Sequence, residues 1–194
     1  MASFVGIAAA LKSIERFLNA AFEEEQPIAG KTTKAVLVRT TDFDPTLQPT
    51  RIGSPALSIF LYRVDFNKTM RAAWAAVASQ DGLGRLAVDL HLLMTAWADN
   101  AEFEFRILGK AMQCVETTPS LVGPMLDPSG GWTPNETVQL VLEDISTEAV
   151  MRTFDSLPTD YRLSIPYIAR IVRIDSRLST PERPVTTVVS GVAP

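Results

Sequence analysis

The chain has 194 residues, of which 46% are hydrophobic and 21% charged, and its formal net charge is −4. That length predicts one globular domain with a hydrophobic core, and the acidic balance argues against a nucleic-acid partner, because phosphate binding needs clustered lysine and arginine. One cysteine, Cys114, and one histidine, His91, exclude an internal disulfide and any metal site built from several of either residue.

The sequence also argues against a signal peptide and a membrane span. Residues 4–11 form a short apolar run, but Lys12, Glu15 and Arg16 follow it and no basic residue precedes it, which reverses the order of a signal peptide. No window approaches the ~18 uncharged apolar residues that a span requires. We therefore expect a cytoplasmic protein without a membrane span.

The first predicted element is an amphipathic helix that ends near residue 25. Its apolar residues recur at steps of three and four, which places them on one stripe: Phe4, Ile7, Leu11, Ile14, Leu18 and Phe22. Glu23, Glu24 and Glu25 follow at the C-terminal end, where the helix dipole disfavours negative charge. This mismatch indicates either fraying or a basic partner nearby, and we expect fraying.

Two strands are predicted next, over residues 34–40 and 56–64, with a polar, proline-marked loop between them at 41–54. Both faces of the second strand are apolar, since Phe60 and Tyr62 oppose Ile59 and Leu61. We therefore expect this strand to lie centrally and to be covered on both sides. Residues 65–84 read as a connection with a helical turn around 70–77.

Residues 86–97 alternate strictly between two faces, which is typical of a half-buried strand. Asp99 then predicts a helix N-cap, because Glu102 stands at the position of a capping box. The expected apolar stripe of that helix is Ala101, Phe105, Leu108, Met112 and Val115. Pro119 follows the end of the helix.

The remaining elements are a loop at 120–134, a strand at 136–143, a short helix from Ser146 through Leu157, and a long strand at 161–174. This order predicts an α+β domain over residues 1–176, with a mixed or mostly antiparallel sheet and two main helices packed on it. Residues 177–194 contain the β-prone run Val185-Thr186-Thr187-Val188-Val189. These residues are expected to form either a loose tail or an arm that pairs with a sheet edge of another chain.

The search for catalytic chemistry yields little. His91 and Asp89 share a strand face, but no G-x-S-x-G motif supplies a nucleophile, so we expect a histidine satisfied by a neighbouring carboxylate or carbonyl. Asp42 and Asp44 match D-x-D-x-T, yet they do not end a strand directly and no acidic pair completes a magnesium site. We therefore expect no catalytic residue, no cofactor and no metal.

Arg170 and Arg173 give the last strand a basic side. Such a side is usually solvated, although it could also meet acidic residues of a partner.

Several segments, taken in their order, resemble a known family. They are Phe60-Leu61-Tyr62-Arg63-Val64, Leu86-Ala87-Val88-Asp89-Leu90-His91-Leu92-Leu93-Met94-Thr95-Ala96-Trp97, Ile107-Leu108-Gly109-Lys110-Ala111-Met112, Leu140-Val141-Leu142-Glu143, Leu157-Pro158-Thr159-Asp160-Tyr161-Arg162-Leu163-Ser164 and Val172-Arg173-Ile174-Asp175-Ser176. Together they look like the tail-terminator, or cap, protein of extracellular contractile injection systems of the antifeeding-prophage and virulence-cassette type.

The resemblance implies a fold like that of phage tail terminators, assembled as a six-membered ring. Such a ring would cap the baseplate-distal end of the inner tube and sheath and end their polymerisation, without a reaction or cofactor. The protein would then be built in the cytoplasm into a particle that can be released. Two alternatives stay open: an adaptor that binds another particle component, and a small hydrolase that uses His91.

The residues expected at interfaces belong to the arm, the basic strand and two loops. They are Val185, Val188, Val189, Arg170, Arg173, Asp42, Asp44 and Trp132. We expect the arm to pair with a sheet edge of sheath or sister subunit. The loops at 41–54 and 120–134 are expected to face the tube end or the next subunit.

Overall fold

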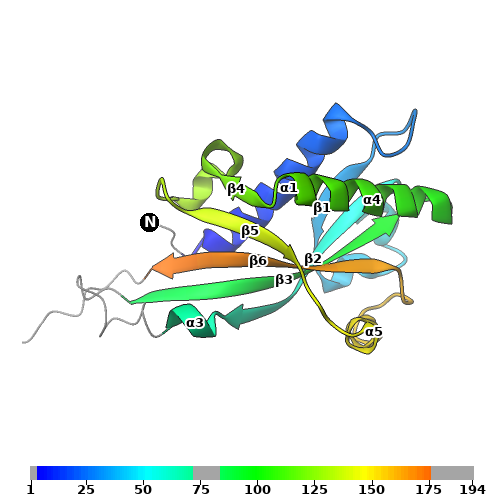
Figure 1. Ribbon diagram of the computed structural model, residues 1–194. Helices are drawn as coiled ribbons and strands as arrows, with labels where there is room; N and C mark the ends of the chain where they lie inside the picture. The colour runs from blue at the N-terminus through cyan, green and yellow to red at the C-terminus, as the bar shows by residue number, and fades with distance from the viewer. Residues whose placement is uncertain (1–3, 72–83, 176–194) are drawn as a thin grey trace, which may run out of the picture.

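The computed structural model describes residues 4–71 and 84–175. In these ranges six strands form one sheet in the order β1-β2-β3-β6-β5-β4, with helices on both faces (Figure 1). β1 runs parallel to β2, and the other neighbouring strands pair antiparallel. The predicted α+β fold with a mixed sheet is therefore confirmed.

The predicted elements are present in the predicted order, and the structure adds β4 in the segment that was expected as the loop 120–134. The strands are β1 (Lys34–Val38), β2 (Ala56–Phe66), β3 (Arg85–Trp97), β4 (Ser120–Val122), β5 (Thr137–Leu142) and β6 (Ser164–Asp175), and the helices are α1 (Gly6–Glu24), α2 (Gln48–Arg51), α3 (Lys68–Arg71), α4 (Ala101–Thr117) and α5 (Thr147–Asp155). The last strand begins at Ser164 and not at Tyr161 as predicted. None of the described helices has the length and apolar character needed to cross a membrane.

Helices α1 and α4 cover one face of the sheet and enclose the larger core (Figure 1). Ile14 and Leu18 of α1 are fully buried, because the three-to-four spacing turns one stripe of the helix to the sheet. Ile107 of α4 packs in the same cluster, as do Leu92 and Met94 of β3.

The predicted stripe of α4 is wrong at three positions. Ala101 is exposed at the start of the helix. Phe105 is 57% exposed and Met112 is 38% exposed. The buried side of the helix is instead centred on Ile107, Ala111 and Cys114. Both stripes have helical spacing, so the pattern could not decide the rotation of α4, which its packing on the sheet determines.

The opposite face carries a second, smaller core under α5 and residues 40–52. Its aromatic centre is Phe43, whose ring lies 5.3 Å from that of Phe60 in an edge-on contact, beside Trp97 and Phe154. β3 is consequently buried on both faces from Leu90 to Trp97, and the predicted half-buried strand is wrong there. The loop at 41–54 likewise contains a 3-10 turn and α2.

Cover on β2 differs between its two halves. Residues 56–60 are buried, as predicted for a central strand, whereas residues 63–66 are exposed. The reason is the length of β1, whose pairing with β2 runs from Ala56 to Phe60. Among the described strands, none pairs with the outer edge of residues 61–66.

Two predictions about helix ends are corrected. Asn100, not Asp99, caps α4, since its Oδ1 accepts a hydrogen bond of 2.9 Å from the backbone N–H of Phe103. The acidic end of α1 is helical to Glu24, and Lys110 contacts Glu25. A basic partner is therefore present where fraying was expected, and its hydrogen bond lowers the pKa of Glu25.

Hydrogen bonds hold the loop at 120–134 against α1. The Arg16 guanidinium donates to the backbone oxygens of Pro124 at 2.8 Å and Leu126 at 3.2 Å. The backbone N–H of Asp127 donates to Ser13 Oγ at 2.7 Å. These contacts hold β4 and its two following 3-10 turns against the larger core.

Candidate functional site: the open half of the sheet face

The part of the sheet face that lies beyond α5 carries polar and charged side chains. Alternation along β3 places His91 on the same face as Leu93 and Trp97 of the smaller core, and the register pairs His91 with Arg63 of β2. A hollow of about 490 Å³ on this face is bordered by His91, Asp89 and Arg170. This surface, from β2 to β6, is called the open face below.

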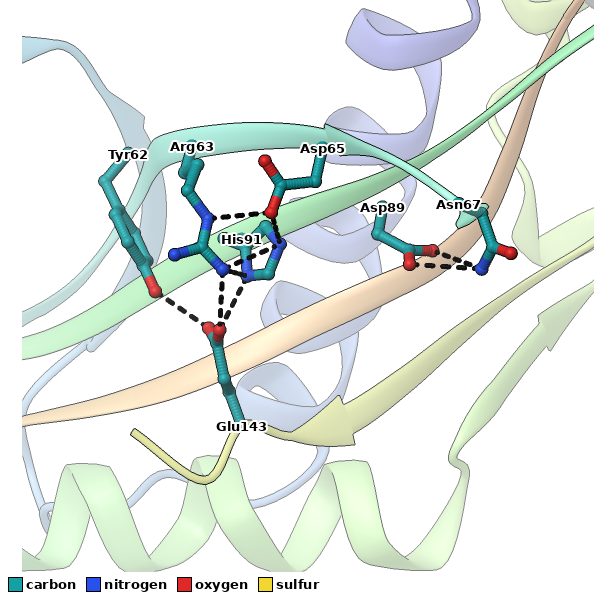
Figure 2. A network of polar contacts seen from close by, with 7 residues as sticks. All are labelled: Tyr62, Arg63, Asp65, Asn67, Asp89, His91 and Glu143. Atoms are coloured by element: carbon teal, nitrogen blue, oxygen red, sulfur yellow. Dashed lines mark hydrogen bonds and ion pairs between the residues drawn. The ribbon is translucent and has the colours of Figure 1, made fainter. Parts of the chain in front are cut away.

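Glu143, directly after β5, collects three contacts at one side of the open face (Figure 2). Its Oε1 lies 2.7 Å from His91 Nδ1 and accepts from Arg63 Nη2 at 3.2 Å. Its Oε2 accepts a hydrogen bond of 2.8 Å from the Tyr62 hydroxyl. The side chains of Glu143 and His91 are each 6% exposed, so this carboxylate is nearly withdrawn from water and needs these partners.

Asp65 completes the polar cluster on its outer side. Its Oδ2 lies 3.3 Å from His91 Nε2 and 3.1 Å from Arg63 Nε. Both ring nitrogens of His91 therefore face carboxylate oxygens (Figure 2). Burial raises the pKa of the Tyr62 hydroxyl, and its hydrogen bond to Glu143 raises that pKa further.

This geometry holds His91 between neighbouring charged side chains. A general base needs a free nitrogen beside a nucleophile, yet the contacts of both ring nitrogens in the described ranges are with Glu143, Asp65 and Arg63. Asp89 is not its partner, because Asp89 accepts a hydrogen bond from Asn67 at 3.1 Å. The expectation of a histidine satisfied by a neighbouring carboxylate is confirmed.

As a group, Tyr62, Arg63, Asp65 and Glu143 were not expected from the sequence. A β-bulge between Leu61 and Arg63 shifts the register of β2 against β3, so Tyr62 and Arg63 both reach Glu143. The available signal was the pair of charges, Arg63 and Asp65, that alternates at the end of an otherwise apolar strand. Within the described ranges, no group of three or more potential ligands could hold a metal ion.

The two predicted arginines lie together on β6 but differ in their partners. Arg173 Nε lies 2.9 Å from Asp175 and 3.1 Å from Glu136. Arg170 is exposed, and its guanidinium makes no ion pair with any described residue. Both arginines border a hollow of about 260 Å³ beside Gln139 of β5.

The predicted residues of the loops take local roles elsewhere. Asp42 accepts a hydrogen bond of 3.0 Å from the backbone N–H of Arg39. Asp44 accepts from the Thr46 hydroxyl at 2.6 Å and from its backbone N–H at 2.8 Å, which lowers the pKa of Asp44. The structure does not bring these aspartates to the arginines, because their segment packs through Phe43 at the other half of the sheet.

Trp132 is half-buried against the larger core, and its Nε1 donates to the backbone oxygen of Asp127 at 2.7 Å. The Trp132 ring lies against Gly130, and a Cβ atom added at Gly130 would be only 2.4 Å from that ring. Val185, Val188 and Val189 lie outside the described residues.

Comparison with known proteins finds a family and a fold that this chain resembles. Residues 9–187 match the family model of the Pvc16 N-terminal domain. The sheath/tube terminator of the extracellular contractile injection system PVC, in its extended state, is 19% identical with a TM-score of 0.56, over 99% of this chain and 64% of that chain. The tube-terminating cap of the anti-feeding prophage is 20% identical with a TM-score of 0.55, over 94% of this chain and 60% of that chain.

The chain therefore spans less than two thirds of the length of either structure. No curated protein sequence matches it.

Proposed function

Because the chain belongs to the Pvc16 N-terminal domain family, we propose that it is a structural cap of a contractile injection system. It binds the baseplate-distal end of the inner tube and sheath and ends their polymerisation. The observation that carries this proposal is the fold, which aligns over 99% of the chain with a sheath/tube terminator. The proposed protein assembles in the cytoplasm and becomes part of the injection particle.

The cap acts without catalysis in this proposal. Support comes from His91, the one histidine of the chain, whose two ring nitrogens face the Glu143 and Asp65 carboxylates. A hydrolase that uses His91 would need this residue to reach a substrate and a nucleophile, and a side chain that is 6% exposed is poorly placed for both.

The functional unit is a homohexameric ring that contacts sheath, tube or both. A ring needs two different surfaces on each subunit, one complementary to the other. The loops at 41–54 and 120–134, with Asp42, Asp44 and Trp132, are the proposed contacts to the tube end or the next subunit. Their backbones are held by local hydrogen bonds, which lowers the entropy lost on binding.

Residues 177–194 form the proposed arm of the domain 1–176. The run at 185–189 adds a strand to a sheet edge of another subunit, with Val185, Val188 and Val189 as its apolar contacts. The outer edge of residues 61–65 of β2 suits such a strand, because no described strand occupies it and its length matches the run.

The decisive experiment measures tube and sheath length with and without the chain. Purified tube and sheath proteins are assembled on baseplates, the full chain is added at a range of ratios, and particle lengths are read by electron microscopy. We expect elongation to stop, with the chain located at the baseplate-distal end. Unchanged lengths together with binding along the side of the particle would indicate the adaptor alternative.

Deletion of residues 177–194 tests the arm. We expect the shortened chain to fold, because these residues lie beyond β6, and to cap less well. A matched control replaces Val185, Val188 and Val189 by serine in the full-length arm. Capping that is undiminished in both variants would contradict the role of the arm and leave the cap function standing.

A further inference from the structure

Arg170 is a cation that the described part of the chain leaves without an anion. It is exposed on β6, at one side of the open face, where it borders both the hollow of about 490 Å³ beside Asp89 and His91 and the hollow of about 260 Å³ beside Gln139. A carboxylate inserted between the two hollows would meet the guanidinium in a partly enclosed place, where charge pairing is stronger than on a flat surface.

Three other charges on this face have partners. Arg63 pairs with Asp65 and Glu143. Arg173 pairs with Asp175 and Glu136. Asp89 accepts a hydrogen bond from Asn67. Lys68 also borders the larger hollow. Among the described residues that line the two hollows, Arg170 is the one that borders both, so it is the position between them that favours an anion from another molecule.

The acidic end of α1 shows the opposite imbalance. Glu23 and Glu24 are exposed and make no ion pair within the described ranges, while Lys110 contacts the neighbouring Glu25. Both carboxylates stand in the last turn of a helix, where the dipole disfavours negative charge. A cation supplied by another molecule would remove this unfavourable interaction.

We propose that Arg170 of one copy of this chain binds Glu23 and Glu24 of a second copy. α1 covers one face of the sheet, and Arg170 lies on the other face (Figure 1 shows α1 and β6). The contact therefore joins two different surfaces, which makes a head-to-tail association that closes into a ring when its rotation allows. The inference rests on the proposed ring and names its charge contact.

Charge reversal on each side, separately and together, tests the contact. The variants are Arg170→Glu, the double variant Glu23→Arg with Glu24→Arg, and the combination of all three. The molar mass of each full-length protein is measured by light scattering after size exclusion, over a range of protein and salt concentrations. We expect each one-sided reversal to weaken self-association about tenfold or more, and the combination to restore it.

Matched controls change the same charges at exposed positions that the proposal does not use. Lys12→Glu and Glu116→Arg are such changes, since neither side chain makes an ion pair among the described residues, and both should leave association unchanged. Circular dichroism checks the fold of every variant. The proposal is overturned if the wild-type chain is monomeric at every concentration, or if the combination associates no better than the one-sided variants.

The capping assay separates this contact from the proposed function. If the wild-type protein stops tube elongation but the combined variant does not restore association, the contact is rejected and the cap function is kept. If the combined variant restores association but the wild-type protein does not stop elongation, the contact is kept and the cap function is rejected.

Discussion

Glu143 illustrates how one residue outside the regular elements joins distant strands. It accepts hydrogen bonds from Tyr62 and Arg63 of β2 and contacts His91 of β3. A carboxylate that is 6% exposed is costly to bury, and these contacts offset that cost. The stability of the sheet therefore depends on Glu143, although this residue is charged and lies outside the strands.

Replacing Glu143 by alanine should lower the free energy of unfolding by about 2 kcal/mol, because it leaves His91 and the Tyr62 hydroxyl without their acceptor. Asp89→Ala is the matched control, and its loss should stay below about 1 kcal/mol because Asp89 contacts Asn67 near the surface. Urea unfolding measures both values. Equal losses would show that Glu143 does not organise the cluster.

Tyr62 supplies a prediction about alkaline pH. Its folded-state pKa is raised by burial first and by Glu143 second, so the folded protein holds the phenolic proton more firmly than the unfolded chain. The resulting stability is fully present below the ordinary pKa of about 10 and is lost as pH rises above it. Tyr62→Phe should flatten this loss, as measured by thermal unfolding across alkaline pH. An unchanged slope in that variant would contradict the assignment.

The elements show where local patterns predict structure and where they do not. Periodicity correctly identified α1 as a helix and β3 as a strand. The reason is that the spacing of apolar residues follows directly from helix and strand geometry. The capping residue of α4 was predicted one position too early, at Asp99, and the structure places it at Asn100. Asn100 has the extended backbone of an N-cap and bonds Phe103, whereas Asp99 contacts Lys31 and Ser54.

Asn100→Ala should therefore cost about 1 kcal/mol of stability through the lost cap. Asp99→Ala should cost less, because its ion pair with Lys31 is solvent-exposed. Chemical denaturation of the two variants side by side checks the order. The reverse order would place the cap at Asp99 after all.

At the scale of the whole molecule, one sheet separates two cores. Trp132 packs beside the larger core, and Trp97 belongs to the smaller one. Because β3 contributes to both cores through its alternate residues, unfolding one core exposes the back of the other. We expect the two cores to unfold together.

Single-tryptophan variants measure this coupling. With Trp74 replaced by phenylalanine throughout, one variant keeps Trp97 and the other keeps Trp132, so fluorescence reports each core separately. The two unfolding curves should coincide with each other and with circular dichroism after correction for the stability of each variant. Separate midpoints that persist after this correction would show two independent units.

The sequence by itself determined the kind and order of the longer elements, the α+β class and the resemblance to tail terminators, because these depend on local spacing and ordered motifs. The short elements α2 and β4, in segments expected as loops, were not predicted. The tertiary structure decided which faces are covered. α5, residues 40–52 and the contacts of His91 turned β3 from a half-buried strand into one buried on both sides over residues 90–97, and packing on the sheet turned Phe105 and Met112 outward.

The partners of His91 were decided in the same way. Asp89 is two residues away in the chain, yet the carboxylates in contact with His91 are Asp65 and Glu143. These contacts depend on a bulge in β2 and on the end of β5, which pairs with β6 and not with β2 or β3. No local pattern contains that information, because the contacts arise when segments far apart in the chain are placed side by side in one sheet.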